Sequence, residues 1–192
     1  MSAKLLDTEI RSCTVCAGFL PNPPKPIFSF SGSSKIVLIG QAPGIKVHKS
    51  GTPWDDASGI RLREWLGVSM EEFYDTKNFA IVPMGFCYPG KGKSGDLPPR
   101  PECAPLWMGP ILKQLRKLRL KILVGGYSQN YFLKDSQRKN LTETVKNWRE
   151  YLPEFVVTPH PSPRNNIWLK KNPWFESELI PELKRIVSKT LQ

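Results

Sequence analysis

Two histidines and four cysteines are the residues of this chain whose types and spacing suggest chemistry. His160 stands between Pro159 and Pro161, so its imidazole should be held rigidly, as a preorganised hydrogen-bond donor must be. A donor fixed in this way can stabilise negative charge that develops on a reacting group. A histidine that only satisfies a polar contact in the core is the structural alternative, so the surroundings of His160 must decide.

The four cysteines are spaced like metal ligands. Cys13 and Cys16 form a C-x-x-C turn that can grip a metal, and Cys87 and Cys103 flank a loop whose ends the same centre would pin together. Four thiolates hold either an iron-sulfur cluster or tetrahedral zinc, and the sequence does not separate the two. Buried thiols without a ligand are the remaining alternative.

Further candidates follow the first glycine-rich turn of the chain. His48, Asp55 and Asp56 could position a water molecule. A carboxylate here could equally cap the helix that is expected to begin near Ser58. Trp54 could stack on a planar ligand, or it could simply pack in the core.

These residues must be positioned by strands and helices, and the hydrophobic pattern predicts both. Four short apolar runs indicate buried strands at 35–40, 79–83, 121–125 and 154–158, while helical periodicity appears at 58–66, 102–118 and 174–187. Strands that alternate with helices favour a three-layer αβα fold with a central four-stranded parallel sheet. We expect a single domain over residues 1–192.

A loop with glycine or proline follows each predicted strand. These loops are 40–44, 83–86, 125–129 and 159–165. In an open α/β sheet, ligands bind outside the carboxyl ends of the strands, so the four loops should converge on one crevice. That crevice is the expected functional site.

Composition indicates the kind of partner. Lys and Arg total 28 against 17 Asp and Glu, a net charge of +11, which favours a polyanion such as DNA. No apolar run approaches the length of a membrane span, and the first residues lack the apolar stretch of a secretory signal. We therefore expect a cytoplasmic protein without a membrane partner, with free thiols rather than disulfides, and a monomer by default.

Two motifs resemble those of one enzyme family. Gly40-Gln41-Ala42-Pro43-Gly44 resembles the first motif of the uracil-DNA glycosylase superfamily, and the HPSPRN segment at 160–165 resembles the second. The GTPW segment at 51–54 is similar to an element of the iron-sulfur branch of that superfamily, and the four cysteines are similar in order to the cluster ligands of that branch. The resemblance spans residues 13–165.

The resemblance implies a role for each matching residue. His160 would meet the oxyanion that develops on the departing base, Trp54 would stack on the flipped base, and the loop with Arg164 would enter the DNA. The expected catalytic residues are His160, Gln41, His48 and Asp55. The expected substrate-binding residues are Gly40, Ala42, Pro43, Gly44, Trp54, Met84, Arg164 and Asn165. The resemblance implies a [4Fe-4S] cluster on Cys13, Cys16, Cys87 and Cys103, with structural zinc as the alternative.

Departures from the family pattern leave the substrate open. Val47 stands where the iron-sulfur branch typically has an acid, and Pro83 stands where that branch reads uracil with an Asn. Proline offers no amide to a base edge. Either Met84, Asn78 or a backbone group reads a different base, or uracil is not the substrate. The sequence thus supports a DNA glycosylase for uracil or another deaminated base, with a catalytically silent nucleic-acid or nucleotide-binding relative as the alternative.

Overall fold

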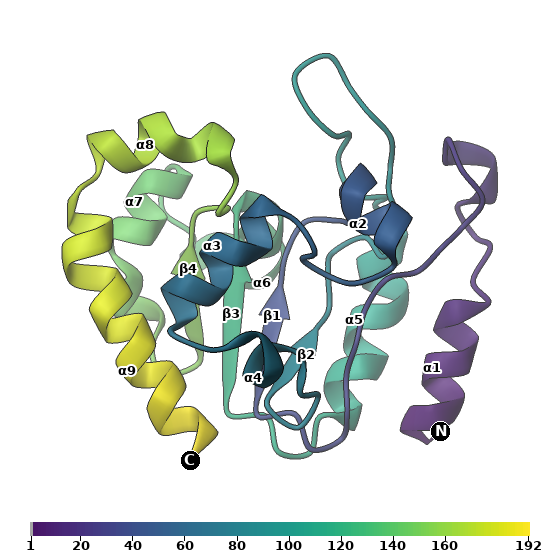
Figure 1. The fold of residues 1–192 in the computed structure, drawn as a ribbon, viewed down its shortest axis with the longest axis horizontal. Coiled ribbons are helices and arrows are strands. Elements are labelled where there is room, and N and C mark those ends of the chain that lie inside the picture. Colours follow the sequence, from purple (N-terminus) through teal and green to yellow (C-terminus); the bar gives the residue numbers. More distant parts are fainter. Residues whose placement is uncertain (1) are drawn as a thin grey trace.

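The centre of the molecule is a four-stranded sheet between two layers of helices (Figure 1). The computed structural model describes residues 2–192. The strands are β1 (Ile36–Ile39), β2 (Phe79–Ile81), β3 (Leu120–Val124) and β4 (Phe155–Thr158). All neighbouring strands pair in parallel, in the order β2-β1-β3-β4. The predicted fold class and the four predicted strands are therefore confirmed.

The strands carry continuous apolar runs because helices cover both faces of the sheet. Every residue of β1 and β2 is buried, and Ile36 lies opposite both Phe79 and Leu120 in the register. A strand that faces water on one side would instead alternate polar and apolar residues. The buried residues form one continuous hydrophobic cluster that runs from Leu6 to Val187.

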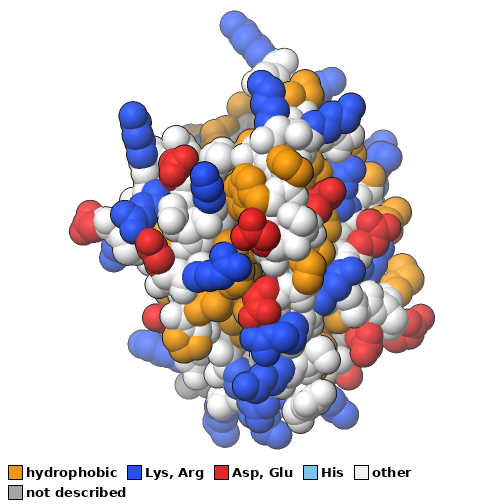
Figure 2. All heavy atoms as spheres, turned by 90° about the vertical axis from the view of Figure 1, so that its left-hand side faces the viewer, with side chains coloured by type: hydrophobic (Ala, Val, Ile, Leu, Met, Phe, Trp, Pro, Cys, Tyr) orange, Lys and Arg blue, Asp and Glu red, His pale blue; other side chains and the backbone are white. Residues whose placement is uncertain are grey.

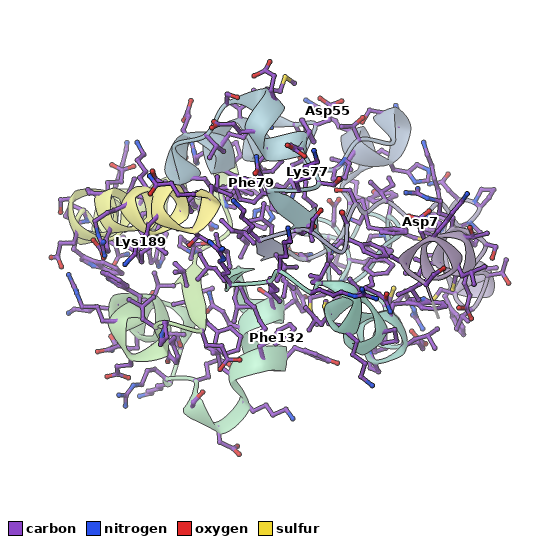
Figure 3. The ribbon with its side chains drawn as sticks, turned by 90° about the horizontal axis from the view of Figure 1, so that it is seen from below. Asp7, Asp55, Lys77, Phe79, Phe132 and Lys189 are labelled. Atoms are coloured by element: carbon purple, nitrogen blue, oxygen red, sulfur yellow. The ribbon has the colours of Figure 1, made fainter. Side chains whose placement is uncertain are left out.

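Helices occupy both sides of the sheet. They are α1 (Ala3–Arg11), α2 (Ile45–Ser50), α3 (Ala57–Leu66), α4 (Met70–Tyr74), α5 (Cys103–Gln114), α6 (Gly126–Leu133), α7 (Leu141–Lys146), α8 (Asn166–Lys171) and α9 (Ile180–Leu191). Viewed from below, α3, α4 and α9 lie on one side of the sheet, and α5, α6 and α7 lie on the other (Figure 3). In that view Asp55, which precedes α3, and Phe132 of α6 are on opposite sides.

Two predicted helices have different bounds in the structure. The pattern at 102–118 indicated a longer helix than α5, which ends at Gln114 because Leu115 leaves the helical region with a ψ of 74°. The pattern at 174–187 corresponds to a π-helical turn, Phe175–Leu179, followed by α9. No helix within residues 2–192 combines the length and the apolar character that crossing a membrane requires.

Candidate active site

The loops that follow the four strands converge on one crevice, as expected. The crevice lies at the carboxyl end of the sheet, the upper end of Figure 1, and has a volume of about 520 Å³. It is lined by Gly40, Gln41, Ala42, Pro43 and Gly44 after β1, Pro83 after β2, Tyr127 after β3, and His160, Arg164 and Asn165 after β4. Both motif segments identified in the sequence therefore contribute to the same cavity.

Backbone hydrogen bonds extend the pairing of β1 and β2 into these loops. Val82 N donates to the carbonyl of Leu38, Met84 N to that of Gly40, and Gly85 N to that of Gln41, each at 2.9 Å. The wall formed by the first motif is consequently as regular as the sheet below it.

Trp54 is fixed by two glycines and a strained backbone. Its φ of 57° is left-handed, which costs a residue with a Cβ on the order of 1–3 kcal/mol. A Cβ at Gly59 would lie 1.7 Å from the Trp54 carbonyl oxygen, and a Cβ at Gly40 would lie 2.8 Å from the indole Cζ2. The Tyr74 hydroxyl donates to the carbonyl of Pro53 at 2.9 Å. These contacts place the indole against the end of β1, at the wall of the crevice.

His160 is held through its own loop. The Asn165 side-chain amide donates to the His160 carbonyl at 2.7 Å, and the Arg61 guanidinium of α3 donates to the carbonyls of Pro161 and Ser162 at 3.3 Å. Asn165 thus positions the histidine in addition to lining the crevice. The imidazole faces the indole of Trp54 with 5.4 Å between ring centroids and 32° between ring planes.

The hydrogen bonds of His160 define which nitrogen carries the proton. Ser162 N–H donates to Nδ1 at 3.2 Å, so Nδ1 is the acceptor and a neutral ring must carry its hydrogen on Nε2. Burial lowers the pKa of His160, while the nearby Asp56 carboxylate raises it by a smaller amount. The neutral form is therefore favoured, with Nε2–H as its donor.

Asp56 is the acidic residue of the 55–56 pair that lines the crevice. One carboxylate oxygen, Oδ1, accepts from Gly59 N–H at 2.9 Å and caps α3, as the structural alternative for this residue predicted. A carboxylate has two oxygens and about four acceptor sites. Capping therefore leaves Asp56 with acceptor capacity toward the crevice.

Four residues that the sequence offered for the site do not line the crevice. Asp55 is exposed and does not line the crevice. His48 lies in the last turn of α2, where its ring packs against Tyr88 at 5.9 Å between centroids, and it also does not line the crevice. Met84 is buried, and Pro83, the residue before it, faces the crevice instead. Asn78 lies before β2, at the opposite end of the sheet, where its side chain donates to the Glu72 carbonyl.

A hairpin between Cys87 and Cys103 adds residues that the sequence patterns did not indicate. Its tip brings Ser94, Gly95 and Asp96 to the crevice. Arg164 Nη1 donates to the Ser94 carbonyl at 3.3 Å, so the loop after β4 touches the hairpin. This contact joins distant segments, and no local pattern of glycine, proline or apolar residues would reveal it.

The four cysteines line one small apolar cavity of about 20 Å³, together with Ile10, Leu20, Phe86 and Trp107 among others. All four are free thiols. Burial raises the pKa of Cys87 to about 11 and that of Cys103 to about 12, and Phe86 N–H donates to Cys103 Sγ at 3.3 Å. No group of three or more His, Cys, Asp or Glu side chains within residues 2–192 is arranged to hold a metal ion. An iron-sulfur cluster or a zinc ion at the cysteines therefore stays a prediction.

Arg100 lies beside this cavity. Its guanidinium pairs with Glu102 at 2.6 Å and covers the Phe19 ring at 4.3 Å from the centroid. Since both contacts occupy the guanidinium, Arg100 is poorly placed to contact the phosphates of a nucleic acid. Elsewhere, the face formed by α7, α8 and α9 shows Lys and Arg side chains interspersed with acidic and apolar ones (Figure 2).

Comparison with known protein families identifies one match. The family model described as the uracil DNA glycosylase superfamily matches residues 28–184, which is more than half of the chain. The matched region contains the whole sheet and the loops that follow its four strands. It begins after Cys13 and Cys16, so it does not cover the complete cysteine cavity.

Proposed function

The chain belongs to the uracil-DNA glycosylase superfamily, and we propose that it is a monofunctional DNA glycosylase that hydrolyses the N-glycosidic bond of uracil or another deaminated base. Superfamily membership supports a DNA glycosylase-like function, and DNA is the substrate that it suggests. The observation that carries the proposal is the pair of rings, His160 and Trp54, that face one crevice at 5.4 Å between centroids.

Trp54 supplies the stacking surface for an extruded base. A base in the crevice lies outside its duplex stack, and an aromatic face replaces part of the stacking that the base has lost. The strained backbone, Gly59 against the main chain of Trp54 and Gly40 against its indole support this role, because they hold the ring in place before a ligand arrives. Holding the ring in advance reduces the entropy that binding would otherwise cost.

His160 stabilises the leaving group. As the glycosidic bond breaks, negative charge develops on the departing base, and a preorganised N–H donor lowers the energy of that state. The Ser162 amide keeps the His160 proton on Nε2, the nitrogen that remains available to donate. Removal of one such donor typically slows an enzyme by about 10²–10³-fold.

Asp56 positions the attacking water. It is the carboxylate that lines the crevice near His160, and its Oδ1 is fixed by the amide at the start of α3. A fixed carboxylate orients a water molecule by accepting a hydrogen bond from it. Of the three residues that the sequence offered for this role, His48, Asp55 and Asp56, we therefore assign it to Asp56.

Base recognition would use Gln41 rather than the residue after β2. Pro83 faces the crevice without an amide, whereas Gln41 lines the same crevice and its backbone is anchored by Gly85 N–H. A side-chain amide both donates and accepts, so Gln41 could pair with the edge of uracil or of a related deaminated base. Arg164, at the exposed rim, would enter the DNA once it leaves the Ser94 carbonyl.

We also propose that the four cysteines hold a [4Fe-4S] cluster. Four thiols from three segments of the chain line one apolar cavity, and together they are a suitable donor set. A cluster, in which each thiolate binds a different iron, tolerates wider spacing between the thiols than tetrahedral zinc does. Such a cluster would connect the N-terminal segment to the hairpin and stabilise the fold. Visible absorbance and iron analysis of freshly purified protein would test it, and stoichiometric zinc without iron would contradict it.

Single-turnover excision tests the glycosylase proposal. The substrates are oligonucleotides with one uracil, hypoxanthine or xanthine, and the proteins are the native chain and His160→Ala. We expect release of at least one of these bases by the native protein and a loss of about 10²–10³-fold in the variant. Absence of excision by intact native protein would leave a catalytically silent DNA-binding relative as the correct description.

A further inference from the structure

A second cavity lies beside the crevice and is not used by the reaction described above. It has a volume of about 400 Å³ and lies at the carboxyl ends of β3 and β4. It shares Gln41, Tyr127, His160 and Asn165 with the crevice, so the two cavities are neighbours on either side of these residues. Its volume falls in the range of about 300–1,000 Å³ that is usual for small-ligand pockets.

The chemistry of this second cavity differs from that of the crevice. The crevice is lined by Asp56, Asp96 and Arg164, whereas no Lys, Arg, Asp or Glu of the described chain lines the second cavity. Its polar side chains include the amides of Gln41, Asn130 and Asn165, and its rings include Tyr127 and Trp168. Aromatic faces with amide groups suit a neutral planar heterocycle, whereas a phosphate or a metal ion would need charged partners.

Trp168 forms a rigid wall of this cavity. Its Nε1–H donates to Thr142 Oγ1 at 2.8 Å, and its ring packs edge-on against Trp174 and Phe175 at 5.8 and 5.6 Å between centroids. Phe175 is fully buried, so these contacts tie the indole to the core. Trp174 does not line the cavity.

Tyr127 forms an exposed counterpart to that wall. It lies in the first turn of α6 and is 41% exposed, and no hydrogen bond or ring contact is formed by its side chain within residues 2–192. An exposed ring beside an aromatic wall is a surface on which a base can stack. Asn130, one turn further along α6, is exposed beside it.

We propose that this second cavity binds the nucleobase adjacent to the extruded nucleotide on the same DNA strand. The assignment rests on the proposed function, since the crevice must hold the extruded nucleotide for its neighbour to reach the second cavity. A neighbouring base can enter only after it leaves its own pair and stack, which single-stranded or mispaired DNA permits at low cost. The protein should therefore prefer single-stranded or locally unpaired DNA over a fully paired duplex.

A binding experiment without excision tests the second cavity. The probes are three single-stranded oligonucleotides: one with a single stable abasic nucleotide at its centre, and two in which the neighbour on the 5′ or the 3′ side lacks its base as well. For the native protein, loss of one of the two neighbouring bases should raise Kd on the order of tenfold, the scale of a base-aromatic stacking contact. In Tyr127→Ala the same loss of a base should leave Kd unchanged.

Tyr131→Ala is the matched control. Tyr131 lies one turn later on α6, is 37% exposed and does not line either cavity, so this variant should respond to the missing base as the native protein does. The proposal is overturned if neither neighbouring base affects native binding, if Tyr127→Ala keeps the full effect, or if none of the three probes binds. If excision occurs but neither excision nor binding depends on the neighbouring base, the proposal for the second cavity fails and the glycosylase proposal stands. If binding depends on the neighbouring base but no base is excised, the glycosylase proposal fails and the binding role of the second cavity stands.

Discussion

The substitution Gly40→Ala isolates the placement of Trp54. A Cβ at this position would lie 2.8 Å from the indole Cζ2, whereas carbon atoms in contact prefer about 3.5–4.0 Å, so the ring must retreat by roughly 1 Å. The ring cannot rotate freely, because its backbone is fixed by Gly59 and the His160 ring lies 5.4 Å from it between centroids. A displacement of about 1 Å in a catalytic arrangement can cost on the order of 10²-fold in rate.

The assay is single-turnover excision of the base that the native protein releases best, together with urea unfolding of each variant. We expect Gly40→Ala to lose on the order of 10²-fold in rate and about 1–3 kcal/mol of stability from overpacking. Gly109→Ala is the control, since a Cβ there meets nothing within 4 Å, and a glycine in a helix gains stability from alanine. It should leave the rate unchanged.

The double variant of Gly40→Ala with Trp54→Phe tests whether the effect passes through the indole. In Trp54→Phe the smaller ring still stacks but should clear the new methyl group, so adding Gly40→Ala to that background should cost little further rate. If Gly40→Ala slows both backgrounds equally, its effect does not pass through the indole. If it keeps the native rate within about twofold, the indole position does not control the chemistry.

Three further predictions concern the acid, the histidine and the cysteines. Asp56→Asn should slow excision by about 10²–10⁴-fold. It should keep the cap of α3, because the amide oxygen can still accept from Gly59 N–H. Asp55→Asn is the control and should have no effect, and equal losses of rate in the two variants would refute the assignment. Burial lowers the pKa of His160 in the folded state below its ordinary value of 6.5, so as the pH falls the unfolded chain takes up the proton before the folded chain does. The free energy of unfolding should therefore decrease as the pH falls below about 6.5, and this decrease is absent above that pH. Urea unfolding at about pH 7.5 and about pH 5.5 measures this decrease, and the free energy of unfolding should decrease less in His160→Gln than in the native protein. Cys103→Ser should lower both the bound iron and the Tm, by roughly 5 °C or more, and a variant with full iron content would contradict the cluster.

The sequence predicted the sheet because its strands are buried on both faces and therefore read as unbroken apolar runs. It also predicted the crevice, since the carboxyl ends of parallel strands must lie at one edge of a sheet. It could not decide which of two adjacent residues faces the crevice. Asp55 and Asp56, like Pro83 and Met84, are neighbours whose side chains point in different directions, and that direction depends on the cap of α3 and on the pleat of β2.

Contacts between distant segments account for the rest. The Ser94 carbonyl meets Arg164 across 70 residues of sequence, and nothing in the composition of the hairpin indicates that its tip reaches the crevice. His48 follows the first motif closely, yet the direction of α2 carries its ring to Tyr88 instead. Such positions depend on how elements are oriented in three dimensions, which a pattern of residue types along the chain does not encode.

The ladder that continues from β1 and β2 into the loops has a consequence for how this family can diversify. The donors are Val82, Met84 and Gly85, and the residue between them, Pro83, contributes no hydrogen bond. Position 83 follows β2, the edge strand of the sheet, and the ladder does not use its N–H, so a proline here costs the sheet no hydrogen bond. Its side chain can therefore be exchanged while the surrounding main chain stays in place, so new base preferences could arise by single replacements at this point without a new scaffold.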